Sequence, residues 1–213
     1  MSNAYVFDLD DTLVASEMRF DKAVFAILDE EGIPHDAKLR QAVTPLGFTQ
    51  LAHFYREQLG VKDSVAHIVE RMEQKMRTLY TDVIRPKPGV PAFLQALHDR
   101  GDRLFVLTAT VHSLTDVCLR NNGLYDLFEQ VWAVDDFGLN KSDVELFERV
   151  ASVIGCSPAK IRYFEDNPIA LENARRAGWQ TFAVYNQNTE TEIADIKKRF
   201  TAFVYSFENF EPK

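Results

Sequence analysis

The chain has 213 residues, of which 46% are hydrophobic and 26% charged, and its formal net charge is −8. This composition excludes a mainly disordered, collagen-like or disulfide-framework protein, and the length allows a sizeable buried core. The acidic balance argues against binding to nucleic-acid polymers or anionic membranes, because both require a basic surface. No apolar stretch approaches 18 residues and no signal-peptide pattern opens the chain, so we expect a cytoplasmic protein.

Short apolar runs that stop abruptly at polar residues are typical of strands buried in a parallel sheet. Six runs fit this description: 4–7, 103–107, 131–134, 161–164, 181–185 and 202–207. Helical patterns that close at Gly or Asn-Gly lie between several of them, at 113–121, 142–154 and 168–177. Strands that alternate with helices predict an α/β fold built on a parallel sheet.

Residues 16–84 interrupt this alternation. They contain three helical patterns, at 16–31, 48–59 and 63–80, and no convincing strand. The proline-rich segment 85–91 then restricts the backbone and is a plausible linker back to the sheet. The sequence therefore predicts an α/β core formed by residues 1–15 and 85–213, with residues 16–84 inserted as a helical subdomain.

Two aspartates, Asp8 and Asp10, follow the first predicted strand. Ligands of open parallel sheets bind beyond the carboxyl ends of the strands, so these side chains are expected to face a crevice. Their spacing of two on an extended segment points both toward the same side. Taken alone, a solvated acidic turn explains them equally well, because Asp is a common turn residue.

Three further strand ends carry groups suited to anion or metal chemistry. Thr108 closes the second strand, Lys141 follows the third, and the acidic pair Glu165 and Asp166 follows the fourth. Each has an ordinary explanation, such as a strand threonine, a solvated lysine or a helix cap. Their occurrence in this order at successive strand ends is harder to explain by chance.

This arrangement resembles the haloacid dehalogenase superfamily, in the branch with a small helical cap, and the similarity covers nearly the whole chain. The motifs that carry it are Asp8-x-Asp10-x-Thr12, the helical insert, Thr108, Lys141 and Glu165-Asp166. The resemblance implies a three-layer, Rossmann-like parallel sheet of order 3-2-1-4-5, with the sixth run extending an edge and a mobile cap that closes over the substrate.

The resemblance also implies the catalytic roles. Asp8 would be the nucleophile that forms an aspartyl phosphate, and Asp10 would protonate the leaving alkoxide and later activate water. Thr108, the Ala109 amide and Lys141 would hold the phosphoryl group. A second aspartate is typical of the family's phosphatases and absent from its dehalogenases, so Asp10 favours phosphate-ester chemistry.

The implied cofactor is Mg²⁺, which prefers hard oxygen ligands and shares the oxygens of a phosphorylated substrate. By the resemblance, its protein ligands would be the carboxylates of Asp8 and Asp166 and the main-chain carbonyl of Asp10. We expect Glu165 to act through water, although the sequence leaves direct coordination open.

The expected substrate is a small phosphate ester, with weak similarity to pyrimidine nucleotidases pointing to nucleoside monophosphates. Phosphoglycolate and sugar phosphates remain alternatives, and a phosphomutase is less expected because β-phosphoglucomutases usually have Gly where Asp11 stands. The cap loop 44–48 is the expected specificity segment, with Phe48 against the leaving group or, alternatively, packed inside the cap. The sequence does not indicate an oligomeric state.

Two non-enzymatic alternatives share part of this pattern. Receiver domains also combine acidic residues, a threonine and a lysine on a parallel sheet, but they place the acidic pair on the first strand and lack a helical insert of about 70 residues. A catalytically inactive binding protein of the same fold would lack a nucleophile or a metal ligand, and none is missing here. The sequence therefore favours an enzyme.

Overall fold

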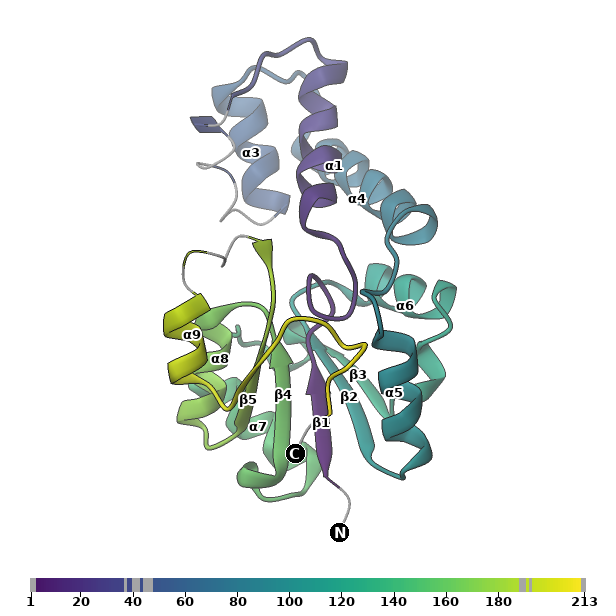
Figure 1. Cartoon of the computed structure of the whole chain (residues 1–213). Helices are drawn as coiled ribbons and strands as arrows, with labels where there is room; N and C mark the ends of the chain where they lie inside the picture. The colour runs from purple at the N-terminus through teal and green to yellow at the C-terminus, as the bar shows by residue number, and fades with distance from the viewer. Residues whose placement is uncertain are drawn as a thin grey trace. The chain divides into compact units, whose positions relative to one another are not determined.

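The structure of the chain is a computed structural model. It describes residues 3–36, 38–39, 43, 48–187, 191 and 193–211, and for residues 17–21 and 48 it describes the backbone alone. The chain divides into two units, Met1–Ala15 together with Arg85–Lys213, and Ser16–Ile84 (Figure 1).

A parallel sheet of six strands forms the centre of the larger unit (Figure 1). The strands are β1 (Ala4–Phe7), β2 (Arg103–Thr108), β3 (Gln130–Ala133), β4 (Ile161–Glu165), β5 (Gln180–Val184) and β6 (Ala202–Val204). Their order is β3-β2-β1-β4-β5-β6, and every neighbouring pair is parallel. This confirms the predicted α/β fold, the order 3-2-1-4-5 and the position of the sixth strand at an edge.

Helices cover both faces of this sheet and make the three layers. They are α5 (Val90–Asp99), α6 (His112–Asn121), α7 (Val144–Ile154), α8 (Pro168–Arg176) and α9 (Ile193–Arg199). Successive residues of a strand point to opposite faces. Val6 accordingly packs in the apolar cluster that includes residues of α7, α8 and α9. Phe7 faces the other way, with its ring centroid 6.3 Å from that of Phe93 in α5. Short 3₁₀ turns also occur in the unit, at Tyr125–Leu127, Val134–Phe137 and Pro158–Lys160.

Helix α5 begins inside the segment that the sequence assigned to a linker. Pro91 lies in its first turn, where proline is tolerated because the helix does not use that N–H group. Gly89, just before the helix, has a φ of 83°. A Cβ atom at Gly89 would lie 2.2 Å from the backbone nitrogen of Glu208, so the close approach of the C-terminal segment requires glycine at this position. The prolines therefore set the start of a helix as well as stiffening the linker.

The second unit is built from helices α1 (Glu17–Glu30), α3 (Phe48–Gln58) and α4 (Val65–Asp82). These match the three helical patterns of the sequence to within two residues at each end. Leu28, Tyr55 and Met72, one from each helix, are buried in a shared apolar cluster. The Tyr55 hydroxyl donates a hydrogen bond of 3.2 Å to the carbonyl of Val24, which satisfies its polar atom inside this core. The helices therefore pack through a core of their own.

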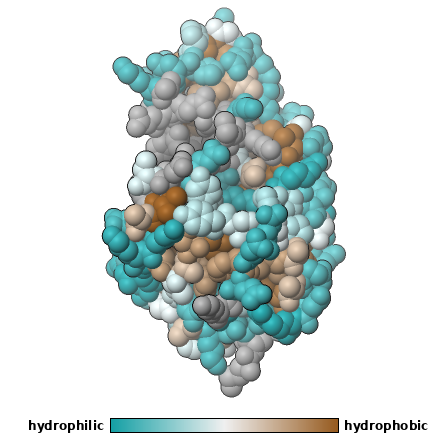
Figure 2. Space-filling view, viewed as in Figure 1, coloured by the Kyte–Doolittle hydropathy of each residue, from teal (hydrophilic) through white to brown (hydrophobic). Residues whose placement is uncertain are grey.

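Hydrophilic residues cover most of the face shown in Figure 2, and apolar residues occupy limited areas of it. Among the described residues, the large apolar side chains that are exposed are Val83, Val111, Val153, Ile169 and Tyr205. No described helix combines the length and the apolar character needed to cross a bilayer.

Candidate active site

The loop that follows β1 carries the first two candidate residues. Asp8 is 5% exposed and its N–H donates to the carbonyl of Phe164 in β4 at 3.0 Å. The N–H groups of Leu13 and Val14 both donate to the carbonyl of Leu9, which closes the loop into a helical turn. Asp11 has a φ of 57°, a left-handed conformation that Asp tolerates better than most residues. The loop thus turns sharply at the carboxyl end of the central strand.

Three carboxylates from two strand ends gather next to this loop. Asp8, Glu165 and Asp166 can each offer one oxygen so that all three atoms lie within 4.8 Å of one another. Hard carboxylate oxygens at this spacing suit Mg²⁺. The only ammonium group that the described side chains pair with Asp8 or Glu165 is that of Lys141, so with all three carboxylates ionised the cluster would carry three negative charges against one positive charge. A dication would balance the remaining two, and the donor set therefore fits a magnesium ion.

Lys141 bridges two of these carboxylates. Its Nζ donates to Oδ1 of Asp8 and, at 2.8 Å, to Oε2 of Glu165. The side chain of Asn173 in α8 donates to the main-chain carbonyls of Lys141 and Ser142 at 3.2 and 2.9 Å. The lysine is therefore fixed at both its backbone and its side chain, over a sequence distance of 133 residues from Asp8.

Glu165 has both of its oxygens occupied by protein donors. Oε2 accepts from Lys141 and from the hydroxyl of Tyr163, and Oε1 accepts from the N–H of Asn167 at 3.1 Å. These bonds tie Glu165 to Lys141, and the expectation that Glu165 acts on the metal through water stays a prediction. The sequence analysis missed Tyr163, because a tyrosine inside a buried strand gives no signal beyond packing.

The shifts in pKa reflect the excess of negative charge. Burial first, and then the charge of Glu165, raises the pKa of Asp8 to about 8, against an opposing effect of Lys141. Burial, followed by the charges of Glu165 and Asp8, raises the pKa of Asp166 to about 9. Burial acts to lower the pKa of Lys141, but the two neighbouring carboxylates raise it above its ordinary value. The site without a metal ion is thus short of positive charge.

Asp10 contacts the loop that follows β2. Its Oδ2 accepts a hydrogen bond of 2.6 Å from the hydroxyl of Thr110. Thr110 is itself held twice, because its N–H donates to Oγ1 of Thr108 at 3.1 Å and its carbonyl accepts from Thr115 at 3.1 Å. Thr108 is 1% exposed, whereas the following Ala109 is exposed. Asp10 and Thr108 are thus brought together through a residue to which the sequence analysis gave no role.

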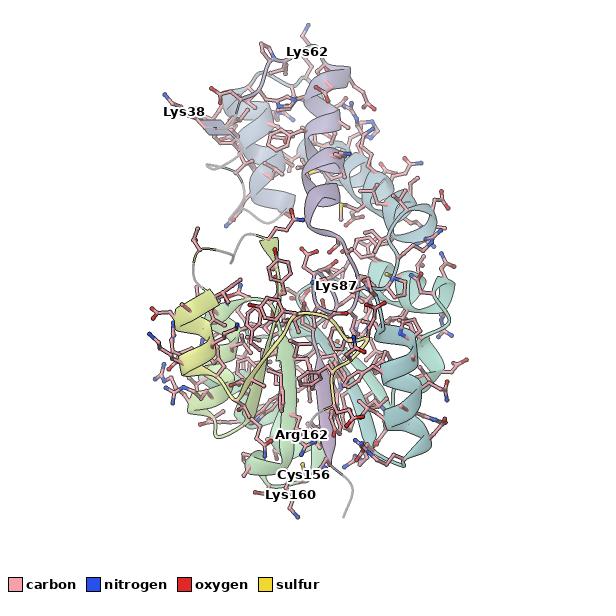
Figure 3. All side chains as sticks on the ribbon, in the orientation of Figure 1. Lys38, Lys62, Lys87, Cys156, Lys160 and Arg162 are labelled. Atoms are coloured by element: carbon pink, nitrogen blue, oxygen red, sulfur yellow. The ribbon has the colours of Figure 1, made fainter. Side chains whose placement is uncertain are left out.

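The carboxyl end of β5 contributes a residue that the sequence analysis missed entirely. Asn186 donates from Nδ2 to Oδ2 of Asp166 at 2.6 Å. Nearby, the ammonium group of Lys87 donates to the main-chain carbonyls of Asp11 and Tyr185, and Figure 3 labels Lys87 at the end of the strands opposite to that of Arg162, Cys156 and Lys160. A signal was present in the sequence, since Asn186 is a polar residue just after a parallel strand.

The expected specificity segment lies outside the described residues. This holds for residues 44–47 and for the side chain of Phe48, whose backbone opens α3. The prediction that Phe48 contacts the leaving group therefore stays a prediction.

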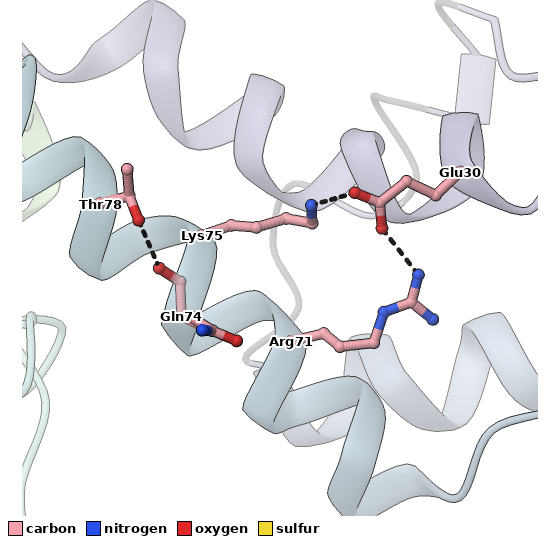
Figure 4. A pocket seen from close by; sticks show the side chains of 5 residues that line it. All are labelled: Glu30, Arg71, Gln74, Lys75 and Thr78. Carbon is pink, nitrogen blue, oxygen red and sulfur yellow. Dashed lines mark hydrogen bonds and ion pairs between the residues drawn. The ribbon is translucent and has the colours of Figure 1, made fainter.

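A hollow of about 350 Å³ lies within the helical unit (Figure 4). Its lining includes Arg71 and Lys75 of α4, and both cations are paired with Glu30 of α1. Arg71 also pairs with Glu31 and Asp63. Because carboxylates neutralise the cations, the residues that line the hollow are best explained as an ion-pair network that joins α1 and α4.

The chain belongs to the haloacid dehalogenase-like hydrolase family, whose sequence model matches residues 5–184. It is 28% identical over 194 residues to the putative phosphatase YhcW of Bacillus subtilis, covering 90% of this chain and 87% of that protein. It is 23% identical over 175 residues to a phosphorylated carbohydrates phosphatase of Thermotoga maritima, covering 82% and 81% of the two chains. These matches confirm the resemblance read from the sequence.

A solved structure, that of a putative β-phosphoglucomutase from Thermotoga maritima, has the same fold. The TM-score is 0.82 at 22% identity, and the match covers 98% of this chain and 96% of the other. This comparison supports the fold assignment and carries no conclusion about the reaction.

Proposed function

We propose that this protein is a Mg²⁺-dependent phosphatase that hydrolyses a small phosphorylated carbohydrate through an aspartyl phosphate on Asp8. The observation that carries the proposal is the cluster at the carboxyl ends of β1 and β4, where Lys141 bridges Asp8 and Glu165 beside Asp166. The family match and the phosphatases among the relatives make the chain a phosphoric monoester hydrolase. A receiver-like signalling module is not supported, because the matching family consists of hydrolases.

Asp8 is the proposed nucleophile and the residues around it prepare it for attack. In the metal-free site, burial among other carboxylates disfavours the ionised form that must attack. Lys141 offsets part of that charge through its bond to Asp8. The carboxylates of Asp8 and Asp166 and the main-chain carbonyl of Asp10 would hold Mg²⁺, which when bound supplies the missing positive charge and orients a phosphate oxygen.

The phosphoryl group would be held by Lys141, the Thr108 hydroxyl and the Ala109 amide at the end of β2. Hydrogen-bond donors placed where negative charge develops stabilise a transition state without reorganising. Thr108 fits this role because it is buried and its Oγ1 already accepts from the backbone of Thr110, which leaves the hydroxyl proton for another acceptor.

Asp10 is the proposed acid and base. It would protonate the leaving alkoxide as the bond to phosphorus breaks, and would then take a proton from the water that attacks the aspartyl phosphate. The hydrogen bond from Thr110 holds one carboxylate oxygen and so fixes the orientation of the Asp10 side chain. Thr110 thus supports Asp10 as a positioning residue.

The proposed substrate class agrees with the relatives and differs from the nucleoside monophosphate expected from the sequence. A relative that matches over four fifths of the chain is named for phosphorylated carbohydrates, and the nucleoside monophosphate prediction finds no support in the comparisons. We therefore place sugar phosphates first. The helical unit remains our proposed cap and the proposed source of substrate choice.

A phosphatase screen tests this function. The purified protein should hydrolyse p-nitrophenyl phosphate with Mg²⁺, and EDTA should abolish the activity until Mg²⁺ is restored, because the carboxylates of the site need a dication to accept a phosphate. Among natural substrates, sugar phosphates should show a higher kcat/KM than nucleoside monophosphates or phosphoglycolate. Full activity in EDTA, in protein free of bound metal, would contradict the proposal, and a preference for nucleotides would contradict the substrate class.

A further inference from the structure

The fifth strand ends beside the fourth, and it places an amide against one of the proposed metal ligands. Asn186 stands two residues beyond β5, and its Nδ2 lies 2.6 Å from Oδ2 of Asp166. Asn186 is 7% exposed, so the bond is largely shielded from water. A carboxylate has two oxygens, and a donor on Oδ2 is compatible with metal coordination through Oδ1.

The residue before Asn186, Tyr185, is hydrogen-bonded through both of its backbone polar groups. The N–H of Tyr185 donates to the carbonyl of Val204 in β6 at 2.8 Å. The carbonyl of Tyr185, which belongs to the peptide bond with Asn186, accepts from the ammonium group of Lys87 at 2.8 Å. These two hydrogen bonds fix the backbone from which the Asn186 side chain extends toward Asp166.

The hydrogen bond from Asn186 occupies one oxygen of the Asp166 carboxylate. Donors that hold a ligating carboxylate fix its orientation, and their loss typically costs metal affinity. The hydrogen bond from Asn186 to Asp166 has the geometry for this role. The motif residues in the sequence did not indicate this donor.

We propose that Asn186 is a positioning residue for the metal site, which acts by orienting the carboxylate of Asp166 toward Mg²⁺. This inference rests on the proposed function, because it assumes that Asp166 is a ligand. It extends the site to β5, a strand outside the motif pattern.

Equilibrium binding of Mg²⁺ to metal-stripped protein, measured by titration calorimetry, tests the inference without relying on activity. Asn186→Leu keeps the branched shape and the number of side-chain heavy atoms and removes the donor, and Asn186→Ala removes the donor with less strain. Both should raise the Kd for Mg²⁺ roughly 10- to 100-fold relative to the wild type. Asn122→Leu is the matched control, because Asn122 donates to the carbonyl of Cys118 in α6 and should leave the Kd unchanged.

Activity at increasing Mg²⁺ adds a second readout. For the Asn186 variants, the Mg²⁺ concentration at half-maximal velocity should rise with the Kd, while kcat at saturating Mg²⁺ should fall much less. An unchanged Kd in either variant, with circular dichroism showing it folded, would overturn the role of Asn186. A loss of kcat with unchanged Kd would do the same. Failure of the wild-type protein to bind Mg²⁺ would instead overturn the proposed function itself.

Discussion

Asp8→Asn is expected to abolish turnover of every phosphate ester, with a loss on the order of 10⁶-fold, the size seen when a covalent nucleophile is removed. The amide of Asn cannot attack phosphorus, and no other described carboxylate lies in the same position at the end of the central strand. The loss should be equal for alkyl and aryl phosphates, since formation of the phosphoenzyme fails for both. Steady-state rates with p-nitrophenyl phosphate and with a sugar phosphate measure it.

The same variant should remain folded, so that its inactivity can be attributed to the missing nucleophile and not to misfolding. Asn has nearly the shape of Asp, and its oxygen can still accept from Lys141. The substitution also removes one of three clustered carboxylates and with it part of their mutual repulsion. The Tm of the metal-free variant at neutral pH should therefore not fall below that of the wild type. A marked fall in Tm would mean that the inactivity reflects misfolding, and substantial residual turnover would contradict the assignment of Asp8.

Asp10→Asn is expected to slow reactions according to their leaving group. With an alkyl or sugar phosphate, loss of the acid should slow formation of the phosphoenzyme by about 10²–10⁴-fold. With p-nitrophenyl phosphate that step should change little, because the leaving phenolate needs no proton. Rapid-quench kinetics of the first turnover distinguish the two cases.

The later step provides the control for this variant. Hydrolysis of the aspartyl phosphate should be slow whichever substrate formed it, because the attacking water lacks its base. The phosphoenzyme should therefore accumulate with the aryl substrate. Equal slowing of phosphoenzyme formation for alkyl and aryl leaving groups would show that Asp10 is not the acid.

The sheet was predictable because its strands are buried on both faces. Runs such as 4–7 and 161–164 are apolar at nearly every position, which is typical of parallel strands and sets them apart from the surrounding helices. Helix α5 was missed because its first turn contains Pro91, and prolines near a helix start resemble a linker. Its identity as a helix depends on packing of Phe93 against Phe7 and Phe164, which local sequence does not reveal.

The candidate site was predictable where a residue occupies a motif position at a strand end. Asp8, Lys141 and Asp166 are of this kind, and the structure brings the first and second into direct contact. Thr110 and Asn186 are different, because each matters only through one hydrogen bond to a residue 100 or 20 positions away. Such bonds depend on strand order and loop conformation, so they become visible only in the folded chain.

Detection of the aspartyl phosphate tests the central claim most directly. The Asp10→Asn protein would be mixed with p-nitrophenyl phosphate and Mg²⁺, quenched in acid, digested at low pH and analysed by mass spectrometry. We expect one phosphoryl group on the peptide that contains Asp8, and none when Asp8 is also replaced by Asn. Product formation without this phosphopeptide, or phosphorylation of a different residue, would contradict the account.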